Sequence, residues 1–365
     1  MSAELKRRKL QTTRSGRTFL LLLSGLFRTG VAIRNFLYNI RLLPIRKLKA
    51  RVICIGNLTT GGTGKTPAVL LAAVTLRKNQ IKTAILTRGY KRPSGGKGVQ
   101  VLLNSKTAPW QEAGDEPWMM HRALKGFEVP ILVHPDRVAA GRSAINYYNP
   151  DVLLLDDGFQ HRRLHRDLDV VLINALDPFG GGSLLPAGNL REPLKALRRA
   201  GLAVITHADQ VTEQELSSIR EQISGIQPGL EILESAHRPD FLFDLKDDKR
   251  RRLAYLKNKP IGCFSAIGDP KSFEDLLRRT GARLVQTWRF PDHHPFSLDE
   301  LRSINNIRDG CPVVTTLKDF PRLPAGWQDV LEGEVLALSI RLEITKGKKV
   351  WEDTICDGKN IPEAD

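Results

Sequence analysis

Cysteines are scarce in this sequence, and their positions argue against a protein stabilised by disulfides or zinc. The 365 residues include four cysteines, which are far apart and form no CxxC pair: Cys54, Cys263, Cys311 and Cys356. We therefore interpret them as reduced residues of a cytosolic protein. Internal repeats and low-complexity segments are absent as well, and the 41% hydrophobic content is enough for a sizeable core and about two domains.

Acidic side chains are too few to balance the basic ones. Lys and Arg number 56 against 40 Asp and Glu, which gives a net charge of +16. Such an excess favours an anionic partner, which could be a nucleotide, a nucleic acid or a phospholipid surface. Charge alone does not choose among these three.

Long apolar runs are also lacking near the N-terminus. The stretch at residues 19–27 is too short for a typical transmembrane helix, and no small-residue cleavage site of a signal peptide follows it. At roughly 100° per residue, one side of the following segment collects Ala32, Ile33, Phe36, Leu37, Ile40 and Leu43. Arg34 and Arg41 lie opposite. We predict a basic amphipathic helix that lies on an anionic membrane surface or packs on the protein's own core.

A glycine-rich segment follows a predicted strand at residues 51–55. It reads Thr59, Thr60, Gly61, Gly62, Thr63, Gly64, Lys65 and Thr66. A helix is predicted to follow at 65–78, so the segment resembles a phosphate-binding P-loop for ATP and Mg²⁺. Lys65 would reach the β- and γ-phosphates, and the Thr66 hydroxyl would bind Mg²⁺. Thr59 replaces the first glycine of the strict pattern, and a plain glycine turn is the alternative.

Continuous apolar runs recur after this helix. Predicted strands lie at 83–87, 130–133, 152–155, 170–173 and 203–205, and a second set of strands and helices begins near residue 260. Their continuous hydrophobicity predicts an α/β fold in which helices flank a parallel, P-loop NTPase-like sheet. We expect an N-terminal segment at 1–45, a P-loop kinase core at 46–225 and a smaller C-terminal α/β domain at 226–365.

Two carboxylates follow the predicted strand at 152–155. Asp156 and Asp157 would lie at the same sheet edge as the P-loop, because the carboxyl ends of parallel strands share one edge. One of them would hold Mg²⁺ directly or through water. Aspartates that end strands also cap turns, which is the structural alternative.

Several further motifs together resemble one family. They are IGNLTTGGTGKTP at 55–67, TRGY at 87–90, AGDEP at 113–117, HPDR at 134–137, DDGFQHRRL at 156–164 and LLPAGNLREP at 184–193. In these motifs the chain is similar to the tetraacyldisaccharide 4'-kinases of the lipid A pathway of Gram-negative bacteria, from about residue 18 to 322. Two positions depart from the family pattern: TLKD at 316–319 replaces TEKD, and Thr87 replaces a more usual serine.

The resemblance implies an ATP-dependent kinase that phosphorylates the 4'-hydroxyl of a lipid-linked glucosamine disaccharide, a tetraacyldisaccharide 1-phosphate. It also implies peripheral association with the cytoplasmic face of the bacterial inner membrane, with no nucleic-acid partner. Reduced cysteines, a basic amphipathic N-terminus and a P-loop agree with such an enzyme.

Catalytic roles follow partly from chemistry and partly from the resemblance. An alcohol is a poor nucleophile, so we expect a carboxylate, Asp115 of AGDEP, to accept its proton. The resemblance pairs Asp115 with His293. The alternatives are that Asp115 caps the helix opened by Pro117 and that His293 is a structural hydrogen-bonding residue.

Basic residues of two other motifs are candidates for phosphate contacts. Arg191 of LREP could lie over the transferring phosphate, and the neighbouring Glu192 could contribute to Mg²⁺ binding. Arg137 of HPDR could contact a phosphate or the substrate. We interpret Arg162 and Arg163 as a solvated face.

Two rival functions remain open. A P-loop ATPase of the partitioning or assembly class, acting on DNA or a protein partner, has a similar loop, but that class has a lysine where Thr60 stands. A non-enzymatic membrane-binding module with a degenerate nucleotide site is the other. The intact sequence from Gly64 to Thr66 argues against it.

Overall fold

The computed structural model describes residues 7, 10–89, 98–103 and 113–357. The chain forms two compact units. The first contains Met1–Arg88, Val129–Ala236 and Ile344–Asp365, and the second contains Gly89–Glu128 and His237–Glu343. This differs from the expected linear division at 45 and 225, because the chain enters the second unit twice and returns to the first at its C-terminal end.

Parallel strands form the sheet of the first unit, in the order β8-β7-β6-β1-β5-β2-β4. They are β1 (Arg51–Asn57), β2 (Thr83–Thr87), β4 (Ile131–Val133), β5 (Val152–Asp156), β6 (Leu168–Asn174), β7 (Leu202–Thr206) and the first residues of β8 (Ile232–Asp244). The strands predicted here are confirmed. Every residue of β1, β2, β5 and β7 is buried, as expected for a parallel sheet covered on both faces.

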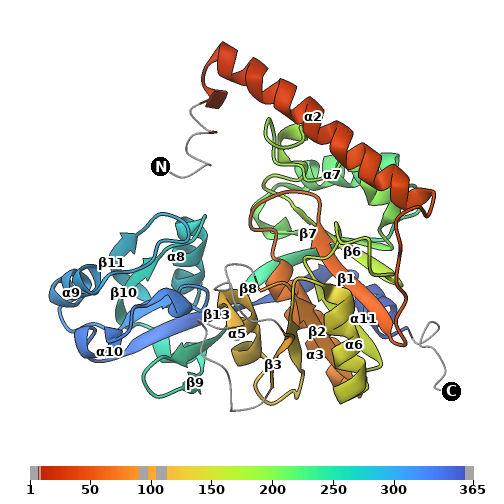
Figure 1. Cartoon of the computed structure of the whole chain (residues 1–365). Helices are drawn as coiled ribbons and strands as arrows, with labels where there is room; N and C mark the ends of the chain where they lie inside the picture. The colour runs from red at the N-terminus through yellow and green to blue at the C-terminus, as the bar shows by residue number, and fades with distance from the viewer. Residues whose placement is uncertain (1–6, 8–9, 90–97, 104–112, 358–365) are drawn as a thin grey trace. The chain divides into compact units, whose positions relative to one another are not determined.

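Helices α3 (Lys65–Lys78) and α6 (Arg137–Tyr148) pack on this sheet (Figure 1). The first unit also contains α7 (Glu213–Ile226) and α11 (Lys348–Cys356), which packs beside α3. The indole of Trp351 is fully buried there and donates to Thr75 Oγ1 at 3.3 Å. Arg51 of β1 donates to the carbonyls of Thr354 and Ile355. The C-terminal helix is therefore part of the first unit's core.

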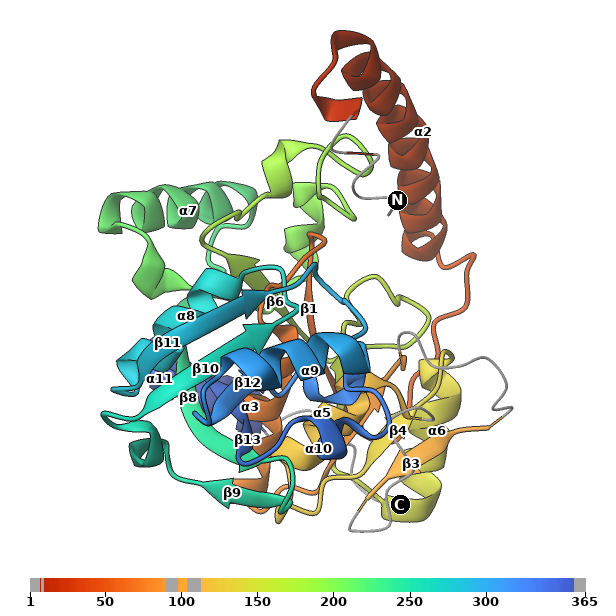
Figure 2. The same cartoon turned by 90° about the vertical axis from the view of Figure 1, so that its left-hand side faces the viewer.

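The second unit is built on further parallel strands. Strands β10 (Pro260–Ser265), β11 (Arg283–Arg289) and β12 (Val313–Thr316) pair in the order β11-β10-β12, and β13 (Val335–Lys346) joins β12. Phe264 contributes to the cluster that contains α9 (Leu298–Ile307), whereas its neighbour Cys263 contributes to the cluster that contains α8 (Pro270–Arg279). Because neighbouring strand residues point to opposite faces, α8 and α9 cover opposite faces of the sheet (Figure 2).

The second unit also contains several shorter strands and helices. They are β3 (Gln100–Leu102), α5 (Asp115–Ala123), β9 (Lys249–Arg251), which pairs antiparallel with β8, and α10 (Trp327–Val330).

The N-terminal helix α2 (Arg14–Asn39) is longer than the sequence pattern predicts (red in Figure 1). The Thr13 side chain caps its start by accepting from Gly16 N, and Ile40 is its C-cap, so Leu43 lies beyond it. Its 26 residues make it long and apolar enough, by length and composition only, to cross a membrane. The expectation of too short an apolar stretch is thus corrected, since residues 19–27 are one part of a continuous helix.

One side of α2 is buried and another is exposed and apolar. The buried residues are Gly16, Leu20, Ser24 and Val31. The side chains more than half exposed include Phe19, Leu22, Leu26, Ile33 and Phe36. Arg34 does not lie on an outer basic face, as the helical pattern predicted, because its guanidinium turns inward to the buried carboxylate of Glu192. A buried carboxylate needs such a partner.

Candidate active site

The P-loop connects β1 to α3 through glycines in backbone conformations that other residues rarely adopt. Gly61 has φ of 107° and Gly64, the N-cap of α3, has φ of 78°. Glycine reaches this region without a steric penalty. The first turn of α3 carries no acidic side chain. Its unpaired N–H groups and the helix dipole therefore favour an anion at this end of the helix.

A buried asparagine that the sequence reasoning missed organises this loop. Asn57, the last residue of β1, is fully buried and donates through Nδ2 to Thr59 O at 2.8 Å and to Thr63 Oγ1 at 2.9 Å. Its Oδ1 accepts from Lys65 Nζ at 3.3 Å. The signal was present in the sequence, because a polar residue that ends a fully buried strand needs partners nearby.

Lys65 and Arg191 converge on one carboxylate. Lys65 Nζ lies 3.7 Å from Asp157 Oδ1, and Arg191 Nη1 lies 3.0 Å from both oxygens of Asp157. Burial by itself raises the pKa of Asp157, but the two cations outweigh it and the pKa is lowered from its usual value. Asp157 is therefore an anion that holds two cations at the start of α3.

Asp156 lies beside this cluster at the end of β5. It is buried, and its Oδ2 accepts from Thr87 Oγ1 at 2.9 Å. Thr87 is one of the departures from the family pattern, yet it supplies the same hydroxyl as a serine. A buried carboxylate at the sheet edge and the hydroxyl of Thr66 in the first turn of α3 fit Mg²⁺, which takes hard oxygen ligands and keeps several waters or phosphate oxygens.

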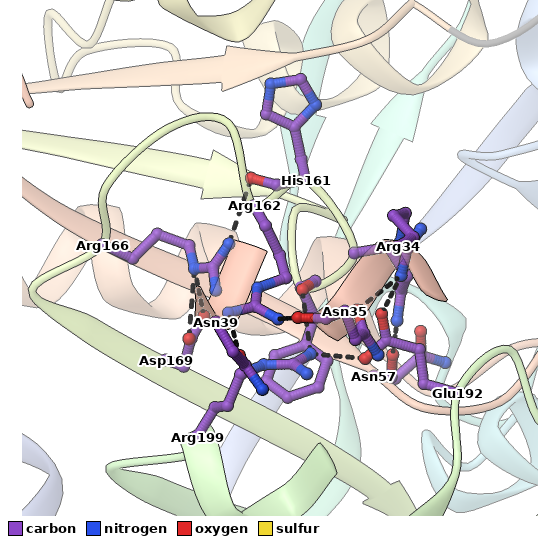
Figure 3. A network of polar contacts seen from close by, with 12 residues as sticks. Arg34, Asn35, Asn39, Asn57, His161, Arg162, Arg166, Asp169, Glu192 and Arg199 are labelled. Carbon is purple, nitrogen blue, oxygen red and sulfur yellow. Dashed lines mark hydrogen bonds and ion pairs between the residues drawn. The ribbon is translucent and has the colours of Figure 1, made fainter. Parts of the chain in front are cut away.

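Glu192 does not fit the metal role predicted for it. Its side chain has no exposed surface, and its two carboxylate oxygens pair with Arg34 of α2 and with Arg199 (Figure 3). Both oxygens are thus occupied by guanidinium groups. The geometry indicates an anchor for α2.

In the second unit, Asp115 and His293 both contact the same arginine, Arg322. Arg322 Nε lies 3.5 Å from Asp115 Oδ2, and Arg322 Nη2 lies 2.9 Å from His293 Nδ1. A guanidinium only donates, so Nδ1 of His293 must accept and the ring proton of the neutral imidazole lies on Nε2. Asp115 and His293 therefore share a contact with Arg322, and their direct pairing stays a prediction.

Asp115 is not the N-cap of its helix. Gly114, with φ of 91°, occupies that position, and Asp115 is the first residue of α5. The capping alternative for Asp115 is wrong, since its side chain points to Arg322.

Arg322 and its second partner, Asp319, were not found from the sequence. Asp319 is fully buried, lies 3.0 Å from Arg322 Nη1 and accepts from Thr316 Oγ1 and from Ala266 N. Burial raises the pKa of Asp319 even though these hydrogen bonds and Arg322 lower it. The TLKD motif, which ends at Asp319, was the available signal.

Residues of the HPDR and DDGFQHRRL motifs line the same sheet edge of the first unit. Arg137 is buried, and burial lowers the pKa of its guanidinium while Asp156 opposes this shift. Burial and the charge of Arg137 lower the pKa of His161 to about 4, so its imidazole is neutral at pH 7. Arg162 is not solvated as predicted: it donates to Asn35 O and to Asn39 Oδ1 of α2.

The parallel sheet, the glycine loop at the start of α3 and the cations around Asp157 define a P-loop nucleotide-binding protein. Comparison with known sequences narrows this class. The profile of the tetraacyldisaccharide-1-P 4'-kinase family matches residues 16–357, and the chain belongs to this family of kinases.

The relatives cover almost the whole chain. The tetraacyldisaccharide 4'-kinase of Elusimicrobium minutum is 44% identical over 353 residues, which are 96% of this chain and 94% of the relative. That of Anaeromyxobacter sp. (strain K) is 39% identical over 91% of this chain and 88% of its own. The crystal structure of LpxK from Aquifex aeolicus in complex with ATP matches with a TM-score of 0.72, at 33% identity, over 92% of this chain and 96% of that one.

Proposed function

We propose that this chain transfers the γ-phosphate of ATP to the 4'-hydroxyl of an acylated glucosamine disaccharide 1-phosphate in lipid A biosynthesis. The convergence of Lys65 and Arg191 on Asp157 at the start of α3 supports this most directly. A dissociative phosphoryl transfer needs cations around the γ-phosphate more than it needs covalent chemistry. Lys65 and Arg191 would supply these cations, and Asp157 positions both of them.

The P-loop residues 59–66 would hold the nucleotide. Their backbone N–H groups and the N-terminus of α3 bind the phosphates, Lys65 contacts the β- and γ-phosphates, and Arg191 stabilises charge on the transferring group. Thr66 with Asp156 or Asp157 would hold Mg²⁺. The metal would neutralise charge between the β- and γ-phosphates.

Asp115 would accept the proton of the sugar hydroxyl. Arg322 holds this carboxylate in place and also donates to Nδ1 of His293. A carboxylate that takes a proton as the phosphoryl group arrives contributes typically 10²–10⁴-fold to such reactions. Asp319 acts through Arg322, since its contacts are with that side chain and with the segment around it.

Helix α2 would bring the enzyme to its acylated substrate at the cytoplasmic face of the inner membrane. Its exposed apolar side chains suit insertion among lipid headgroups. We favour a helix that lies along the surface. A spanning α2 would have to release the contacts that Ser24 and Arg34 make with the folded unit.

Radiolabelled transfer tests the function against its main rival. Purified protein is incubated with γ-labelled ATP, Mg²⁺ and either a tetraacyldisaccharide 1-phosphate or double-stranded DNA. We expect label in the lipid and no stimulation of ATP hydrolysis by DNA. DNA-stimulated hydrolysis without lipid labelling would instead establish the partitioning-type ATPase.

Sedimentation with anionic liposomes tests the membrane contact. The double substitution of Phe19 and Phe36 by glutamate should release the protein, because both side chains are more than half exposed on α2. Tyr147→Glu is the matched control, since Tyr147 is 78% exposed on α6. Equal sedimentation of the α2 variant and the control would place the membrane contact elsewhere.

A further inference from the structure

One loop of the first unit contacts the membrane helix on one side and the P-loop on the other. We call residues 184–192 the bridging loop. On the side of α2, the buried Ser24 hydroxyl donates to Leu184 O at 2.9 Å, and Arg34 pairs with Glu192. Just before the helix, Gln11 Nε2 donates to Ala187 O at 3.1 Å. The loop therefore follows α2 over most of the helix's length.

The other side of the bridging loop holds the P-loop by main-chain bonds. Thr60 N donates to Asn189 O at 2.8 Å, and Arg191 N donates to Leu58 O at 2.7 Å. Thr59 and Leu190 form an antiparallel bridge. The bridging loop and the P-loop are thus hydrogen-bonded to each other at the point where the nucleotide phosphates would bind.

Arg191 and Glu192 are adjacent and serve the two sides separately. Arg191 contacts Asp157, which also pairs with Lys65. Glu192 contacts Arg34 and Arg199, and the guanidinium of Arg199 stacks on the Phe159 ring with its carbon 4.4 Å from the ring centre. The contact with α2 and the contact with the phosphate site therefore lie on one backbone segment. A movement of Glu192 would move Arg191 with it.

Because Glu192 is buried, its carboxylate depends on its cationic partners, which include Arg34. Glu192 has no exposed surface, and a buried carboxylate that loses a cationic partner is strongly destabilised in its position. Arg162 fixes the end of the same helix through Asn35 and Asn39 (Figure 3). The helix is thereby held in one register relative to the bridging loop.

We propose that Glu192 is a positioning residue: by pairing with Arg34 of α2 it holds Arg191 in place for phosphoryl transfer, so that docking of α2 sets the turnover rate. This rests on the proposed role of Arg191 in the kinase. It assigns α2 a second task besides membrane binding, since the helix positions Arg191 through the bridging loop.

The test combines kinetics in detergent micelles with exchange of two amide hydrogens. Arg34→Gln and Glu192→Gln should each lower kcat about tenfold, with the KM for lipid and binding to liposomes changed less than twofold. The double variant should be no worse than Glu192→Gln, because Arg34 acts through Glu192. Arg34→Lys should restore most of kcat. In Arg34→Gln, the amides of Thr60 and Arg191 should exchange faster than in the wild type.

Arg198→Gln is the control, because Arg198 is exposed beside Arg199 and donates only to the carbonyl of Ile226 among its described contacts. A lower melting temperature with unchanged kcat and unchanged exchange would make the contact purely structural and overturn the proposal. A raised KM with unchanged kcat would make it a membrane contact only. If Glu192→Gln does not fold, Arg34→Gln and Arg34→Lys decide. A wild type that labels no lipid would reject the kinase function, and the exchange of Thr60 and Arg191 would still decide the coupling.

Discussion

The two polar clusters that this chain assembles are built in opposite ways. The nucleotide side is nearly continuous in sequence, since Asn57, Lys65 and the glycines between them fold as one turn. The Asp115 cluster joins segments that are 207 residues apart, through the single guanidinium of Arg322. Both clusters nevertheless use an arginine held by a carboxylate, Arg191 by Asp157 and Arg322 by Asp319. Local backbone geometry builds the glycine loop of the first cluster, to which Asp157 and Arg191 add side-chain pairing, whereas long-range side-chain pairing builds all of the second cluster.

The largest effect should come from the local cluster. Lys65→Ala removes the cation nearest the proposed γ-phosphate, so we expect kcat to fall about 10³-fold while the fold is kept. Lys78→Ala, at the exposed end of the same helix, is the control and should be silent. Lipid labelling by both variants measures the difference. Near-normal labelling by Lys65→Ala would remove the P-loop from the mechanism.

Asp115→Asn should have the next largest effect. The amide keeps the shape of the side chain but takes no proton, so kcat should fall about 10²-fold with ATP affinity and Tm nearly unchanged. His293→Ala should cost less, because the carboxylate remains. Asp275→Asn, on the exposed side of α8, is the matched control. Full turnover by Asp115→Asn would show that Asp115 is not the proton acceptor and that the second cluster has a structural role.

Arg322→Lys probes whether the second cluster depends on geometry. Lysine keeps the charge but cannot contact Asp115, His293 and Asp319 at once, so we expect about a tenfold loss of kcat. Arg322→Ala leaves Asp319 buried without its cation and should also lower the stability by about 3 kcal/mol. Tm and kcat of the two variants measure these outcomes. If Lys at 322 supports full activity, charge alone suffices there.

The smallest effect concerns stability in acid. The folded-state pKa of His161, about 4, lies below its ordinary 6.5, so the neutral ring contributes stability above pH 6.5 that is lost as the pH falls toward 4. The Tm of the wild type should therefore drop over this window more than the Tm of His161→Asn. Parallel curves for the two proteins would show that His161 does not titrate there.

The same contrast explains what the sequence could predict. Continuous apolar runs identified the strands around β1, because burial on both faces leaves a direct trace in the sequence. The start of α3 at Lys65 and the acids that end β5 were predicted because strand, turn and helix follow one another. Arg34 and Arg322 were missed. Their partners lie far along the chain, and helical periodicity gives the direction of a side chain without its partner.

The division of the chain into two units was hard to predict because it also depends on contacts between segments that are far apart in sequence. Helix α5 lies between β2 and β4 in sequence but belongs to the unit that contains residues 237–343, and α11 packs on α3. Apolar runs indicate that an element is buried. They do not say which other element buries it.

The double entry of the chain into the second unit has a consequence for how the protein is made. Residue 115 leaves the ribosome 207 residues before Arg322. At the usual bacterial rate of translation, this interval lasts roughly 10–40 s. During that time the nascent α5 has no access to its buried arginine partner, whereas the glycine loop of the first unit already has Asn57 and Lys65 in place. The glycine loop can therefore form during synthesis, whereas the Asp115 side has to wait for Arg322 and the core of the first unit is completed only when α11 follows.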